Sequence, residues 1–191
     1  MEDIEKLKGK VAVKDIYVLY QEAFPPSELQ PWDNFQAMAE DGRTEIFGMT
    51  VSGNGEVKPI AALIAIPFEQ YAYVPYLAVA KEYRNRKIGT PLFKQVMDWY
   101  WEKGIVTIGE VELPETEMAA RRLRAYERLG VNVNEFPYTM PDFQTGDVIQ
   151  MYPISYPRKL TEEEWQQCGG KMRRLCAGDM SVLGETYANA I

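Results

Sequence analysis

Residues 76–93 read Tyr76-Leu-Ala-Val-Ala-Lys-Glu-Tyr-Arg84-Asn-Arg-Lys-Ile-Gly89-Thr-Pro-Leu-Phe93. The first residues are typical of a strand, the middle is a basic turn, and an amphipathic helix is predicted from about residue 88. A helix that begins at such a turn offers unpaired amides and the positive end of its dipole, which together bind anions. Gly89 would let a pyrophosphate approach the backbone, and Thr90 would add a hydroxyl donor. The pattern is neither GxxxxGK[ST] nor GxGxxG.

The flanking sequence predicts one α/β (α+β) domain in which helices and strands alternate around this unit. Pro75 interrupts the strand that leads into the turn, so we expect a bulge there, because proline donates no ladder hydrogen bond. The expected helices cover 11–24, 32–39, 88–103 and 118–129, and the expected strands cover 44–51, 60–66, 72–80, 105–113 and 148–154.

A second segment, Ala119-Ala-Arg-Arg-Leu-Arg-Ala-Tyr126-Glu-Arg-Leu-Gly130-Val, follows the first after one predicted strand. The two segments resemble motifs A and B of the GNAT superfamily, in which motif A reads Arg/Gln-x-x-Gly-x-Gly/Ala and motif B ends in Tyr-Glu-x-Leu-Gly-Phe. Arg84 to Gly89 matches motif A with one departure, Lys87 in place of the first glycine. The resemblance spans residues 11–154 and is strong over 73–131.

The resemblance implies the GNAT fold: a central mixed, mostly antiparallel sheet with helices on both faces. Two strands splay apart in a V at the acyl-CoA site. We expect this domain to cover residues 1–155. Residues 156–191 are expected to form a helical appendage, used for packing or as the contact of a homodimer. Thr161 and Glu164 predict a capping box at its first helix, and Gly169-Gly170 is expected to break that helix.

Acetyl-CoA is the cosubstrate that the resemblance implies, with its pantetheine arm added to an open strand edge. The backbone amide near Leu77 would polarise the thioester carbonyl. The full set of expected contacts to the coenzyme is Leu77, Ala78, Val79, Arg84, Asn85, Arg86, Lys87, Ile88, Gly89, Thr90 and Ala119. Leu77 and Val79 could also serve as ordinary core residues of the strand.

Tyr126 is the predicted general acid, because its helical position points inward and its counterpart in the family protonates the leaving thiolate. The alternative is a core tyrosine. Glu110 or Glu112, which share a face of their strand, is the possible general base, although both could be solvated or no protein base needed. The family's usual glutamate on the strand before motif A is missing.

The resemblance also implies the acceptor, a primary amine on a small molecule or a peptide that attacks the thioester directly. A set of aromatic residues could line its pocket in this acidic protein, although most of them suit ordinary core and loop positions equally well: Phe24, Trp32, Tyr71, Tyr73, Tyr76, Tyr138 and Tyr152.

Composition excludes several other chemistries. The 191 residues include no histidine and two cysteines, which argues against histidine catalysis and His/Cys metal sites, so no metal is expected. The formal charge of −7 disfavours nucleic-acid binding and nucleic-acid-linked acyl transfer. Neither a signal peptide nor a membrane span is evident, so a cytoplasmic protein is expected. The main alternative to an enzyme is a non-catalytic acyl-CoA-binding or regulatory module.

Overall fold

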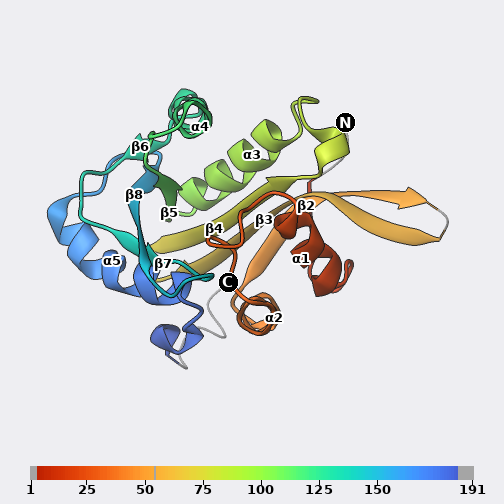
Figure 1. Ribbon diagram of the computed structural model, residues 1–191, viewed down its shortest axis with the longest axis horizontal. Coiled ribbons are helices and arrows are strands. Elements are labelled where there is room, and N and C mark those ends of the chain that lie inside the picture. The colour runs from red at the N-terminus through yellow and green to blue at the C-terminus, as the bar shows by residue number, and fades with distance from the viewer. Residues whose placement is uncertain (1–3, 54, 185–191) are drawn as a thin grey trace.

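A single layered α/β unit emerges from the computed structural model, which describes residues 4–53 and 55–184 (Figure 1). Its strands are β1 (Glu5–Lys6), β2 (Glu45–Gly53), β3 (Glu56–Phe68), β4 (Tyr71–Val79), β5 (Val106–Glu112), β6 (Asn132–Val133), β7 (Thr139–Pro141) and β8 (Val148–Tyr156). The spatial order is β1-β2-β3-β4-β5-β8-β6, and β7 pairs with β8. Only β4 and β5 pair in parallel among the described strands. The expected mixed, mostly antiparallel sheet is thus confirmed.

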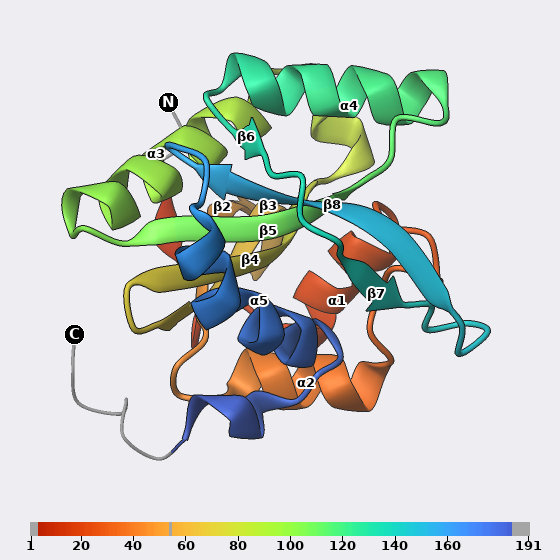
Figure 2. The ribbon, with the colours of Figure 1, turned by 90° about the vertical axis from the view of Figure 1, so that its left-hand side faces the viewer.

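Helices cover both faces of this sheet. They are α1 (Val13–Gln21), α2 (Trp32–Glu40), α3 (Gly89–Glu102), α4 (Glu117–Arg128) and α5 (Glu162–Cys176), with short 3-10 turns η1 (Lys81–Tyr83) and η2 (Met180–Leu183). Figure 2 shows α3 and α4 on one side of the strands and α1, α2 and α5 on the other. Two separate hydrophobic clusters fill the two layers. None of the helices in the described ranges is long and apolar enough to cross a bilayer.

β4 and β5 separate soon after they meet. Their pairing covers only Tyr71–Tyr73 and Val106–Ile108. On the other side of β4 the register with β3 shifts between Ile64 and Ile66, opposite Val74 and Pro75. Pro75 has no N–H to donate, so the expected bulge is present and β4 turns away from β5. The result is an open gap between two strands that start as neighbours.

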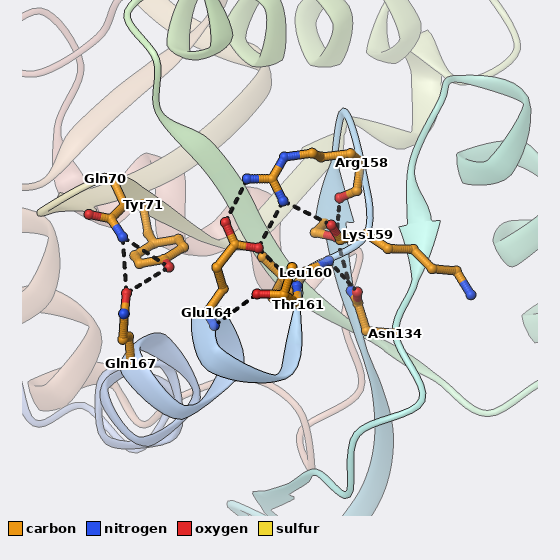
Figure 3. Close-up of polar contacts among 10 residues, drawn as sticks. Gln70, Tyr71, Asn134, Arg158, Lys159, Leu160, Thr161, Glu164 and Gln167 are labelled. Atoms are coloured by element: carbon orange, nitrogen blue, oxygen red, sulfur yellow. Dashed lines mark hydrogen bonds and ion pairs between the residues drawn. The ribbon is translucent and has the colours of Figure 1, made fainter.

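The helix predicted after residue 160 begins as expected and ends later than expected. Its capping box is present: Glu164 N–H donates to Thr161 Oγ1 (3.2 Å), and Thr161 N–H donates to the Glu164 carboxylate (2.8 Å). Arg158 donates to both oxygens of the same carboxylate, at 2.8 and 2.6 Å (Figure 3). The beginning of α5 is therefore tied to the end of β8.

The expected break at Gly169-Gly170 was wrong, because α5 continues to Cys176. Gly169 lies under the indole of Trp165, where a Cβ would come within 2.8 Å of ring carbons. The indole stacks on Phe136 with ring centroids 5.1 Å apart. Gly169 thus makes room for this stacked pair, and packing outweighs the weak helix propensity of glycine.

α5 joins the core on the α1 and α2 side of the sheet. Its buried side chains Cys168, Met172, Leu175 and Cys176 belong to the same cluster as the buried residues of α1 and α2. The predicted boundary at residue 155 falls inside β8, and the described part of the expected appendage packs into this core. A contact between two copies through residues 156–191 stays a prediction, and residues 185–191 lie outside the described part of the chain.

Candidate active site

A cavity of about 380 Å³ occupies the gap between β4 and β5. Residues 74–79 of β4 form one wall, and residues 107–112 of β5 form the facing wall. Side chains from α3, α4 and β8 close the cavity on one side of the sheet. The segment between α1 and α2, together with Cys176 at the end of α5, closes it on the other. The cavity therefore passes through the sheet and reaches both layers.

The backbone of β4 exposes hydrogen-bonding groups to this cavity. Ala80 N–H donates to the carbonyl oxygen of Ile60 on β3 at 2.8 Å. Successive residues of a strand direct their backbone N–H and C=O groups to opposite edges of the strand. Since Ala80 faces β3, the N–H and C=O groups of Leu77 and Val79 face the open gap. This is the orientation that the predicted backbone role of Leu77 requires.

The turn between β4 and α3 combines unpaired backbone amides with exposed basic side chains. Ile88, at the N-cap of α3, provides no side-chain cap. Within the described residues, the amides of residues 85–90 donate no hydrogen bond. Asn85 and Lys87 have φ angles of 64° and 58°, and the side chains of residues 84–87 are exposed. Lys87 adopts the left-handed conformation that favours glycine, which accounts for the glycine that the family has at this place.

Arg84 holds this turn together. Its Nε donates to the carbonyl of Val79 at 3.1 Å, and a terminal nitrogen donates to the carbonyl of Glu22 at 3.1 Å. The Arg86 guanidinium lies 5.1 Å from the centre of the Tyr83 ring. Part of the donor capacity of Arg84 is therefore used by the protein itself to join the turn to β4 and to the end of α1.

The expected coenzyme contacts fall into three groups in space. Leu77, Ala78, Val79 and Arg84 line the cavity. Residues 85–90 form the basic turn just beyond the end of β4. Ala119 lies apart from both, buried in the first turn of α4, where its N–H donates to Thr116 Oγ1 at 3.1 Å.

Glu110 carries the strongest carboxylate perturbation in the cavity. Burial raises its pKa to about 8. Tyr73 O–H donates to Glu110 Oε1 at 2.6 Å and Tyr138 O–H to Oε2 at 3.4 Å, and both bonds lower the pKa in part. The nearby charge of Glu28 raises it. The raised pKa brings the ionisation of Glu110 much closer to neutral pH than that of an ordinary carboxyl group.

Glu112 is placed differently from Glu110 although both line the cavity. Its Oε1 lies 2.6 Å from an Arg122 guanidinium nitrogen in an ion pair. The ion pair occupies this carboxylate, whereas Glu110 is held only by the two phenols. The geometry thus favours Glu110 among the two expected candidates.

Tyr126 lies on the opposite side of the gap from Glu110. It packs in the cluster beneath α3, with its ring centre 5.8 Å from that of Phe93, whereas Tyr73 and Tyr138 belong to the other cluster. Burial raises its pKa above the usual 10, partly offset by the charge of Arg122. The phenol therefore stays protonated at neutral pH, and it lines the cavity.

The expected aromatic set is divided by the structure. Phe24, Tyr73 and Tyr76 line the cavity, and Tyr138 supports Glu110 from behind. The remaining members do not line it: Trp32 packs on Tyr17, Tyr71 donates to Gln167, and Tyr152 lies on β8.

Several lining residues were not predicted from the sequence. They are Glu28, Arg122, Met140, Met151 and Cys176. Arg122 lies within the segment that resembles motif B but was given no role there, and the others lie in segments without a motif. Only tertiary packing brings them to the gap.

Comparison with known proteins agrees with this geometry. The sequence model of the family described as "Acetyltransferase (GNAT) family" matches residues 13–131. A GNAT-family acetyltransferase from Bacteroides thetaiotaomicron superposes with a TM-score of 0.73 at 21% identity, covering 92% of this chain and 98% of that one. The ribosomal-protein-S18-alanine N-acetyltransferase of Escherichia coli gives a TM-score of 0.61 at 21% identity, covering 85% and 97%.

A third solved structure contains the coenzyme. It is a Bacillus subtilis acetyltransferase in complex with CoA, with a TM-score of 0.55 at 15% identity, covering 81% of this chain and 97% of that one. At such identities the likeness concerns the fold. No curated protein shows significant sequence similarity to the chain. Since the family model matches well over half of the residues of this chain, the chain belongs to the acetyltransferase (GNAT) family.

Proposed function

We propose that this protein transfers an acetyl group from acetyl-CoA to a primary amine by direct attack of the amine on the thioester. The observation that carries the proposal is the arrangement around the gap. A proton acceptor, Glu110, lies on one face of the sheet, and a proton donor, Tyr126, lies on the other, with the unpaired edge of β4 between them.

Binding of the coenzyme follows from the backbone. The pantetheine arm adds to the gap-facing backbone groups of Leu77 and to the Val79 N–H as an extra strand would, while Arg84 already donates to the Val79 carbonyl. The amides of residues 85–90 and the dipole of α3 receive the pyrophosphate, and the exposed cations of the turn add to the attraction. The thioester then lies beside β4, between the two layers.

The chemical steps use groups that the cavity already holds. Glu110 takes a proton from the ammonium, and the free nitrogen attacks the thioester carbonyl carbon to form the new C–N bond. Leu77 N–H donates to the oxygen that becomes negative. The C–S bond breaks as the carbonyl re-forms, and Tyr126 gives its proton to the leaving sulfur. The acylated nitrogen loses its remaining excess proton to the Tyr126 phenolate, which restores the phenol, and Glu110 releases its proton to solvent. The products are an amide and CoA.

The test measures free thiol released from acetyl-CoA with a panel of primary amines. We expect turnover by the intact chain, a loss of about a hundredfold or more in Tyr126→Phe and Glu110→Gln, and CoA affinity within a few-fold of wild type in both. Tight CoA binding without thiol release on any amine would instead indicate a non-catalytic acyl-CoA-binding module.

A further inference from the structure

Glu28 places a carboxylate in the cavity wall from outside both family motifs. It lies on the segment between α1 and α2, is partly buried, and lines the cavity together with Glu110. Electrostatic interaction between the two carboxylates contributes to the raised pKa of Glu110. Because both carboxylates line one cavity, a molecule bound there can contact Glu28 while its reacting nitrogen lies at Glu110.

The segment that carries Glu28 is held firmly. Tyr76 O–H donates to the carbonyl of Glu28 at 3.4 Å and accepts from Gln30 N–H at 3.0 Å. The buried Gln30 side chain donates to the carbonyl of Cys176 at 2.8 Å, which joins the segment to the end of α5. The carboxylate is therefore presented from a fixed backbone, as a preorganised binding group requires.

Within the described residues, the Glu28 side chain has no hydrogen bond or ion pair, unlike the other two carboxylates of the cavity. Burial and the charge of Glu112 raise its pKa, while Arg122 lowers it. A partly buried carboxylate without a partner is costly to keep charged, and a ligand cation would remove that cost.

The rest of the chamber suits a short hydrocarbon chain. Phe24, Tyr76, Met140 and Met151 provide apolar walls. Arg122 is already paired with Glu112, so it offers little to an anionic group on the ligand. The cavity of about 380 Å³ must also hold the acetyl end of the coenzyme, so only part of it receives the acceptor.

We propose that Glu28 binds a second positive charge on the acceptor, so that the preferred acceptor is a short aliphatic diamine with one nitrogen at Glu110 and the other at Glu28. The inference rests on the proposed function, because it names the substrate class of the same site. The Glu28 carboxylate acts by binding and takes no part in proton transfer.

Three compounds with the same four-methylene chain test the proposal: diaminobutane, pentylamine and 5-aminopentanoate. They differ only in the group at the far end, which is ammonium, methyl or carboxylate. Affinity for the CoA-saturated protein is measured by calorimetry, and kcat/KM by thiol release from acetyl-CoA. We expect about a tenfold or greater preference for diaminobutane over pentylamine in both readouts, as one charge-assisted contact provides.

Glu28→Gln should reduce that preference to less than about threefold. Glu22→Gln is the matched control, because it removes the same charge from the exposed end of α1 and should retain the preference. Equal affinity for diaminobutane and pentylamine, tighter binding of 5-aminopentanoate, or a preference that survives Glu28→Gln would each overturn the inference. Diamine binding that depends on Glu28 without any thiol release would uphold the binding site and refute the proposed acetyl transfer.

Discussion

Replacing Glu110 by glutamine should make the protein more stable at alkaline pH while removing its activity. Burial raises the pKa of this carboxyl from 4.5 to about 8. The folded state therefore keeps a proton that the unfolded chain releases between these two values. Stability contributed by that proton is present in full below pH 4.5, declines as the pH rises toward 8, and is gone above it.

The size of the decline follows from the linkage relation. One pKa unit corresponds to about 1.4 kcal/mol, and integration from pH 5 to pH 9 gives a loss of about 4 kcal/mol for a shift of this size. The carboxyl is partly exposed to the cavity, so we expect about 2–4 kcal/mol. Glutamine does not ionise and can still accept from Tyr73, so Glu110→Gln should escape this loss.

The measurement is urea denaturation of wild type and Glu110→Gln at several pH values from 5 to 9. The two should have similar free energies of unfolding at pH 5 and diverge as the pH rises. Glu127→Gln, on the exposed face of α4, is the control and should follow the wild-type curve. Parallel curves for wild type and Glu110→Gln would show that Glu110 titrates at its ordinary pKa, and the argument for it as the base would fail.

Three further predictions concern other parts of the structure. Tyr73→Phe removes a hydrogen bond that lowers the pKa of Glu110, so the alkaline rise of kcat/KM should move to higher pH in a pH–rate profile. Lys87→Gly should raise the free energy of unfolding by about 0.5–1 kcal/mol in urea, because it relieves a left-handed φ, and should weaken CoA binding at low salt. Gly169→Ala should destabilise by about 1–3 kcal/mol through the clash with the indole. Gly170→Ala, with open space around it, should be neutral or stabilising by up to about 1 kcal/mol in the same denaturation assay.

Features encoded in contiguous sequence were predictable. The strand, basic turn and helix around Gly89 depend on local alternation, local charge and helix periodicity, and the structure reproduces each of them. The bulge at Pro75 follows from a single missing N–H. The capping box at Thr161 follows from a spacing of three residues. In each case the physical cause lies within one segment.

Features that depend on contacts with neighbouring side chains, many of them from other segments of the chain, could not be predicted. Glu110 and Glu112 share a strand face and look equivalent in the sequence. They differ because Arg122 pairs with one and two phenols hold the other. Gly169 looked like a helix breaker because its packing partners, which make a side chain impossible there, lie on another segment and one turn back.

Family membership says more about one half of the cavity than about the other. The half that we propose for the coenzyme is made by β4, the basic turn and α3, all within the matched residues 13–131. On the acceptor side, Met140, Met151 and Cys176 come from beyond that range, and Glu28 comes from a loop without a motif. Such a division would let one coenzyme site serve different acceptors as these outer segments change. The acceptor must therefore be inferred from side-chain chemistry in this chain, and the unpaired carboxylate of Glu28 is the most specific clue there.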